Sequence, residues 1–112
     1  MLWPAFNIAL KDLLDSWGAF LKTPESNYTL TDKDDGWFGK YGIKSLEADD
    51  RGVFNDTYVT PDPDAINRGY TSWDDFFTRE VQSGARAVHA PENKTMIHNA
   101  CESTVYNIAT KM

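Results

Sequence analysis

The chain has 112 residues, of which 41% are hydrophobic and 13% aromatic, enough to build the core of one small domain. Its formal net charge of -6 argues against a nucleic-acid partner, because phosphate binding requires clustered Lys and Arg side chains. The same negative charge opposes electrostatic docking on an anionic membrane. No apolar run in the sequence reaches the length of a membrane span.

The single cysteine, Cys101, cannot form an intramolecular disulfide, which favours a reducing compartment. The apolar stretch near the N-terminus has no basic residue before it and is interrupted by Asp12 and Asp15, a pattern that is not typical of a signal peptide. We therefore expect an intracellular, cytoplasmic protein, and the composition leaves membrane association open.

Residues 4–22 are predicted to form an amphipathic helix. Pro4 suits a first helical turn, and Pro24 ends the helix by restricting the residue before it. Because the polar side carries Asp12 and Asp15 rather than a basic cluster, we expect the apolar face to pack on a core. A helix that binds a membrane surface or a partner is the alternative. The apolar residues recur at three- and four-residue spacing: Phe6, Leu10, Leu13, Leu14, Trp17, Phe20 and Leu21.

Residues 24–39 are predicted to be a loop that contains an acidic run beginning at Asp32. A calcium loop that started at Asp32 would have Gly36 in place of its third ligand and Ile43 in place of its bidentate glutamate. The spacing therefore favours a solvated turn, and we expect no metal site. Two histidines near Cys101 also lack the fourth ligand and the pairing of a zinc site.

Residues 40–48 are predicted to form a short helix, and residues 49–69 resemble a linker. Within the linker, the pairs Val53-Phe54 and Tyr58-Val59 either anchor the segment to the core or form a short strand. Residues 60–68, rich in proline and aspartate, are the best candidate for a boundary.

A further helix is predicted to begin at Thr71 or Ser72, either of which can cap free amides. Trp73, Phe76 and Phe77 line one side of this helix, which we expect to continue past Val81 and to end at Ser83-Gly84. The four tryptophans of the chain are expected to be mainly core residues: Trp3, Trp17, Trp37 and Trp73.

Two short strands are predicted, at Thr95–His98 and at Thr104–Ile108. Since an isolated hairpin of this size is marginal in water, their partner strands must come from elsewhere. The predicted fold class is therefore α+β, with N-terminal helices followed by the first strands of an incomplete β-fold. We divide the chain into a helical region, residues 1–66, and the start of a second domain, residues 67–112.

Several motifs in the second half of the chain resemble phosphatidylserine decarboxylases. The run TSWDDFFTRE resembles a helix of that family with a Phe-Phe-x-Arg core, here Phe76, Phe77 and Arg79. Residues 84–92 look like the family's Arg-Pro-Ile…Pro-Asp element, although Ala87 replaces the usual proline. Residues 99–105 look like the start of a family strand, Pro-Cys-Asp-Gly-x-Val.

The resemblance extends to a fungal-type branch of the family that decarboxylates free aromatic amino acids such as tryptophan. It rests on TPES at residues 23–26, DGWFG at residues 35–39 and the later runs GYTSWDDFFTR and NACESTVY. Several independent motifs in the same order are far more specific than one short pattern. The resemblance covers most of the chain from about Thr23 onward.

The resemblance implies a lyase with a self-made pyruvoyl cofactor. In the family, a serine that follows a glycine becomes the pyruvoyl group after chain cleavage, with help from an acid and a histidine. The pyruvoyl carbonyl forms a Schiff base with the substrate amine and accepts electrons as carbon dioxide leaves. The implied substrate is phosphatidylserine, for phosphatidylethanolamine synthesis, or a free amino acid.

Glu102 is the candidate relay acid, because it occupies the position of the family's aspartate after the cysteine. An exposed strand carboxylate is the alternative interpretation. None of the seven glycines is followed by serine, so the cleavage site is missing. We therefore predict a fragment or truncated member of the family, inactive alone, whose partner is the remainder of the decarboxylase. The rival hypothesis is a non-enzymatic helical module that binds a partner through its aromatic face.

Overall fold

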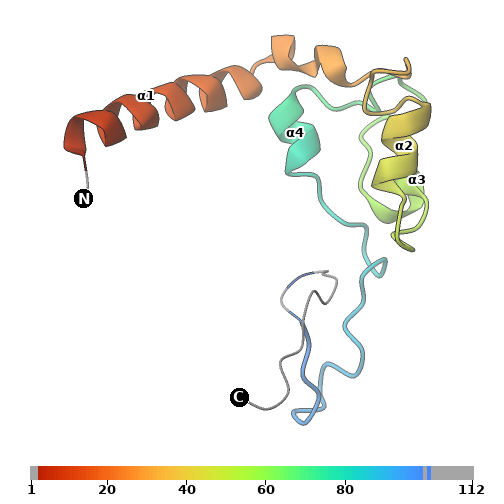
Figure 1. Cartoon of the computed structure of the whole chain (residues 1–112). Coiled ribbons are helices and arrows are strands. Elements are labelled where there is room, and N and C mark those ends of the chain that lie inside the picture. Colours follow the sequence, from red (N-terminus) through yellow and green to blue (C-terminus); the bar gives the residue numbers. More distant parts are fainter. Residues whose placement is uncertain (1–2, 100, 102–112) are drawn as a thin grey trace.

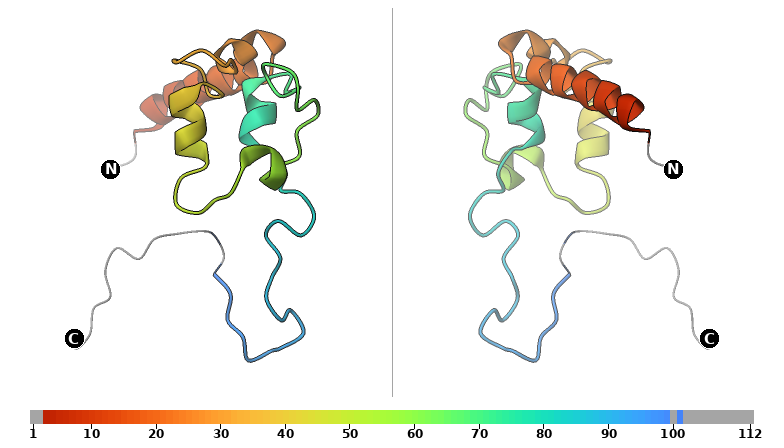
Figure 2. Two further views of the ribbon diagram at one scale, coloured as in Figure 1. Left: turned by 90° about the vertical axis from the view of Figure 1, so that its right-hand side faces the viewer. Right: turned by 90° about the vertical axis from the view of Figure 1, so that its left-hand side faces the viewer.

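The computed structural model describes residues 3–99 and residue 101, and their architecture is helical. One long helix, α1 (Pro4–Leu21), projects from a group of shorter elements, to which its C-terminal end is attached (Figure 1). After that group the chain runs away from the helices in an extended path (Figures 1 and 2). The shorter elements are the 3₁₀ helix η1 (Pro24–Thr29), α2 (Lys40–Leu46), α3 (Phe54–Thr57) and α4 (Trp73–Phe77).

The predicted N-terminal helix is confirmed, but its predicted packing on the core is wrong. Pro4 lies in the first turn, where its missing amide donor leaves no helical bond unmade. The helix ends at Leu21, and the amide of Lys22 donates to the carbonyls of Ala19 and Phe20. No residue of α1 is buried, because its main packing partner among the described elements is η1, at its C-terminal end.

The segment predicted as a loop at residues 24–39 forms η1 and then a tight turn. The turn is closed by hydrogen bonds from the amides of Trp37 to the Thr29 carbonyl (3.0 Å) and of Phe38 to the Thr31 carbonyl (3.0 Å). A Cβ atom at Gly39 would lie 1.8 Å from the carbonyl oxygen of Lys33, so only glycine fits there. This close approach directs the Phe38 side chain into the core.

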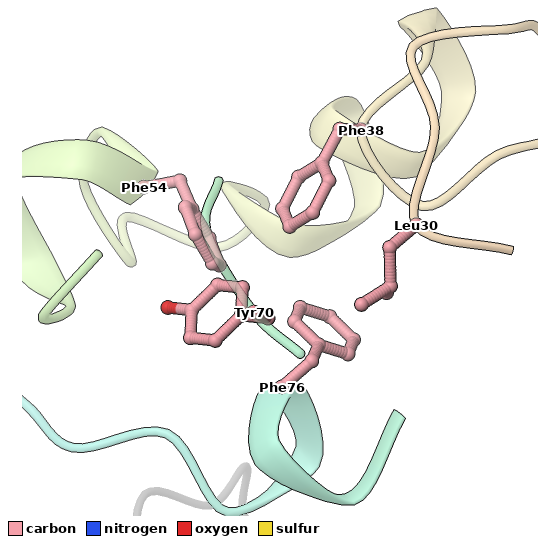
Figure 3. Close-up of a cluster of buried hydrophobic side chains, with 5 residues drawn as sticks. All are labelled: Leu30, Phe38, Phe54, Tyr70 and Phe76. Atoms are coloured by element: carbon pink, nitrogen blue, oxygen red, sulfur yellow. The ribbon is translucent and has the colours of Figure 1, made fainter. Parts of the chain in front are cut away.

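The core is a cluster of four aromatic rings and one leucine, drawn in Figure 3. Phe76 of α4 lies at its centre, with ring centroids 5.5 Å from Phe38, 5.7 Å from Tyr70 and 6.3 Å from Phe54. The contacts with Phe38 and Tyr70 are edge-on, an arrangement that aromatic quadrupoles favour. The cluster joins four separate stretches of chain: Leu30, Phe38, Phe54, and Tyr70 with Phe76.

Two arginines cover this cluster with their guanidinium groups. The Arg79 guanidinium carbon lies 4.3 Å from the ring centroid of Tyr58 and 4.8 Å from that of Phe76, and Nη1 donates to the Phe76 carbonyl. Arg68 lies 5.1 Å from the centroid of Phe38. Such cation–π contacts strengthen as they lose water. The arginine of the Phe-Phe-x-Arg motif therefore has a structural role in this chain.

The predicted linker is anchored to the core by Phe54 and Tyr58. Phe54 is buried in α3, and Tyr58 packs against the cluster. Tyr58 also forms an isolated antiparallel bridge with Val81, and the Val59 amide donates to the Glu80 carbonyl at 2.9 Å. Of the two interpretations of this segment, core anchoring is thus confirmed for these aromatic residues.

Helix α4 begins where the sequence predicts and ends earlier. The Ser72 hydroxyl caps it by accepting from the Asp75 amide at 3.1 Å, while the Asp75 carboxylate accepts from the Thr71 amide at 3.0 Å. The predicted end at Ser83-Gly84 is wrong: α4 stops at Phe77. Val81 pairs with the strand-like segment at Tyr58, which is incompatible with a continued helix.

The α+β fold class is confirmed only for its helices. Within the described residues the only β-pairing is the isolated bridge, and Thr95–His98 forms no strand. Ile97, in the middle of that segment, is 95% exposed. The predicted strand Thr104–Ile108 lies outside the described residues. The proposed division between residues 66 and 67 stays a prediction.

We expect Phe76→Ala to lower the free energy of unfolding by about 3–5 kcal/mol, because it removes the ring that contacts the other aromatic core residues. Phe77→Ala, on the adjacent and 63% exposed ring, is the matched control and should cost about 1 kcal/mol or less. Urea denaturation followed by circular dichroism measures both values. Equal losses for the two variants would contradict the assigned core.

Burial raises the pKa of Tyr70 above its ordinary value, and its hydroxyl donates to the Val59 carbonyl at 2.8 Å. A raised pKa in the folded state means that Tyr70 contributes full stability below about pH 10, the unfolded value, and loses it as pH rises through the folded value. The free energy of unfolding should therefore fall above about pH 10. Tyr70→Phe should reduce this slope, whereas Tyr41→Phe, on an exposed ring, should leave it unchanged.

Candidate functional site

The residues proposed for catalysis do not form a described site. Glu102 lies outside the described residues, so its role as relay acid stays a prediction. Cys101 is exposed, as are His89 and His98. Within residues 3–99 and 101, no group of three or more His, Cys, Asp and Glu side chains is placed to hold a metal ion.

The described residues instead form an apolar hollow of about 180 Å³ where α1, η1 and α4 meet. We call it the aromatic hollow. Two turns of the sequence supply most of its walls: the end of α1 running into η1, and the turn that carries Trp37. Its lining residues are Trp17, Phe20, Leu21, Ser26, Tyr28, Thr29, Trp37 and Trp73.

Ser26 holds the hollow together. Its hydroxyl accepts from the amide of Trp73 at 2.9 Å, across 47 residues of sequence. The same oxygen lies 2.8 Å from the carbonyl of Leu21 and 2.7 Å from that of Thr23, either of which can accept its proton. One buried hydroxyl therefore joins the end of α1 to the start of α4.

Ring contacts set the shape of the aromatic hollow. The Trp37 ring lies 6.4 Å from Trp73 and 5.5 Å from Phe76, so the hollow shares a wall with the core. Trp73 stacks on Phe77 at 4.8 Å with an angle of 17° between the planes. At the other side, Trp17 lies 5.8 Å from Phe20 of the same helix.

The chemistry of the aromatic hollow is that of a contact surface. The described residues that line it include no Asp, Glu, His, Lys or Arg, so it offers no general acid or base at neutral pH. Apolar walls with a few hydroxyl groups suit an apolar or aromatic group of a partner or ligand. Of the expected tryptophans, Trp3, Trp17 and Trp37 are exposed and Trp73 is half-buried, so their predicted place in the core is wrong in all but Trp73, which packs on it.

Sequence reasoning missed the role of Ser26 and of the hollow. The available signal was the motif TPES, whose serine is Ser26, together with DGWFG, which supplies Trp37. Spacing alone could not bring these two motifs to Trp73, because the join depends on a long-range hydrogen bond and on a turn without side chains at two glycines.

We expect Ser26→Ala to lower the free energy of unfolding by about 1–3 kcal/mol, because it leaves the Trp73 amide without an acceptor. Ser83→Ala, at an exposed position, is the control and should change stability by less than about 0.5 kcal/mol. Denaturant titrations give both values. A neutral Ser26→Ala would contradict the role of this hydroxyl.

Comparison with known proteins bears on the same segments. Residues 1–46 match the family model of phosphatidylserine decarboxylase, PSDC. The chain is 58% identical to decarboxylase iboD of Amanita muscaria over 106 residues, which is 95% of this chain and 30% of that protein. It is 31% identical to the L-tryptophan decarboxylase of Psilocybe cubensis, over 92% of this chain and 25% of the relative.

A second L-tryptophan decarboxylase, from Psilocybe cyanescens, is 30% identical over 94% of this chain and 26% of its own length. No solved structure matches the chain significantly. The chain thus spans less than a third of the curated relatives that it matches. The resemblance found in its motifs is confirmed: this polypeptide is a part-length member of the phosphatidylserine decarboxylase-like family, related to its fungal decarboxylases.

Proposed function

We propose that this chain is a scaffold segment of a pyruvoyl-dependent carboxy-lyase and works in an intracellular compartment together with the remainder of the decarboxylase. The observation that carries this proposal is the 58% identity to a fungal decarboxylase across 95% of the chain. The family match in residues 1–46 supports it independently, because that match includes the whole of α1 and the turn that carries Trp37.

The substrate of the complete enzyme is a free aromatic amino acid or phosphatidylserine. The first is supported by the two relatives named as L-tryptophan decarboxylases, and the second by the family description. Both molecules carry the α-amino carboxylate that a decarboxylating carbonyl cofactor acts on. Within the described residues no helix has the length and hydropathy needed to cross a bilayer.

The 112-residue chain does not itself fit the pyruvoyl group, since none of its glycines is followed by serine. A pyruvoyl carbonyl supplies an electron sink for decarboxylation, and in the complete enzyme it comes from the remaining polypeptide. What this segment contributes is a packed aromatic core and, through Glu102, a carboxylate that can orient a histidine during self-cleavage. Glutamate is one methylene longer than the family's aspartate, so that orientation requires a longer reach.

The rival function, a non-enzymatic helical binding module, is favoured by the exposed apolar groups. Phe77 stands out of the core beside Trp73, and the apolar face of α1 is uncovered by the described residues. Both observations also agree with a segment cut from a larger protein, where the remaining polypeptide would cover them. The experiment below separates the two hypotheses.

A chimera tests the proposed function. In decarboxylase iboD of Amanita muscaria, the matched segment is replaced by this chain, and carbon dioxide release is followed with tryptophan, with other free amino acids and with phosphatidylserine vesicles. We expect the chimera to decarboxylate one of these substrates, because most contacts of a 58% identical segment are kept. Deleting the segment should abolish activity. A folded, self-cleaved chimera without turnover on any substrate of the parent enzyme would refute the proposal.

The isolated chain should release no carbon dioxide above a blank without protein, and its intact mass should show neither backbone scission nor a pyruvoyl group. Turnover by the isolated chain would show that the missing Gly-Ser pair is not needed. The same chain, if it is a binding module, would be active in no chimera while still capturing a partner.

A further inference from the structure

The face of α1 formed by Phe6, Leu10, Leu13, Leu14 and Trp17 is the largest apolar feature that the described residues leave uncovered. We call it the docking face. At 100° per residue these five side chains lie within one side of the helix, and none of them is ionisable. Their exposure is large: Leu13 is 65% exposed and Trp17 is 58% exposed. Soluble proteins rarely leave an apolar stripe of this kind open to water.

The opposite side of α1 is polar and of mixed charge. Lys11 and Asp15 form an ion pair one turn apart, and Asp12 lies beside them. A helix that inserts into an anionic membrane surface carries a basic cluster at this position, which α1 lacks. The docking face is therefore matched to an apolar protein surface rather than to lipid.

The docking face continues into the aromatic hollow. Trp17 belongs to both, and Phe20 and Leu21, one turn later, line the hollow. The hollow in turn reaches α4 through Ser26, which accepts from the Trp73 amide. A single continuous surface thus runs from the free end of α1 to the core, as the position of α1 in Figure 2 allows.

Resting on the function proposed above, we propose that the docking face and the aromatic hollow together bind the remaining polypeptide of the decarboxylase, and that α1 acts as the clamp between the two. More than two thirds of the Amanita muscaria relative lies outside the part that this chain matches. The family match includes every residue of α1, so the face belongs to the segment that phosphatidylserine decarboxylases share. A polypeptide of that size is the occupant that both findings supply.

The chain offers a matched pair of positions for a test. Leu13 lies on the docking face and Ile8 on the opposite side of the same helix, and they are 65% and 62% exposed. Leu13→Cys and Ile8→Cys are made separately in a Cys101→Ser background. Each is placed in the isolated chain and in the iboD chimera, and the rate of maleimide modification at that position is read by peptide mass spectrometry.

We expect both cysteines to react rapidly in the isolated chain. In the chimera, Leu13→Cys should react roughly tenfold more slowly or less, while Ile8→Cys keeps its rate, because modification follows exposure of the thiol. Equal rates at the two positions of the chimera would overturn the proposal. Protection of Leu13→Cys in the isolated chain, rising with its concentration, would overturn it in favour of a second copy as the occupant.

A second measurement does not depend on labelling. Leu13→Asp should lower the yield and thermal midpoint of the chimera, whereas Ile8→Asp, an identical change on the other side of α1, should leave both unaltered. In the isolated chain neither variant should shift the unfolding midpoint, because α1 contributes no buried residue. Protein yield and labelling are read whether or not the chimera turns over substrate. An inactive chimera with a protected Leu13→Cys would refute the proposed function alone.

Discussion

The packing of rings around Phe76 is the interaction on which the rest of this structure depends. The chain has almost no β-pairing among its described residues and only one helix longer than two turns, so backbone hydrogen bonds between elements cannot hold it together. Four stretches of sequence meet instead through the aromatic cluster, and Arg68 and Arg79 shield its edges with their guanidinium groups. A small core of this kind is marginal by itself.

That marginality agrees with a segment of a larger enzyme. The residues inside the cluster are satisfied, whereas the apolar groups at its margin, Phe77 and the docking face of α1, remain in contact with water. A complete domain of similar length would be expected to cover such groups. The family relatives, three to four times as long as the part they share with this chain, provide the polypeptide that could do so.

The family motifs acquire a physical meaning in the fold, and the meaning is structural. The serine of TPES accepts from the Trp73 amide, and the glycines of DGWFG permit a turn that no Cβ atom would fit. The arginine of Phe-Phe-x-Arg lies on the face of the core rings. These motifs maintain the scaffold, while the chemistry proposed for the family depends on groups that the remaining polypeptide would supply.

The sequence by itself determined the elements with strong local signals. The three- and four-residue spacing of apolar side chains and the two flanking prolines set the length of α1, and Ser72 with Asp75 set the start of α4, because capping and periodicity are properties of neighbouring residues. The motifs also identified the family, since their order along the chain needs no three-dimensional information.

Only the tertiary structure decided what those elements contact. The apolar face of α1 has the pattern of a core helix, yet nothing in the described chain covers it, and periodicity cannot distinguish a face that packs internally from one that awaits another polypeptide. Helix α4 ends early because Val81 pairs with Tyr58, 23 positions before it in the sequence, and local propensity carries no record of such a partner. The aromatic hollow arises in the same way, from a hydrogen bond between Ser26 and Trp73 that joins segments far apart in the chain.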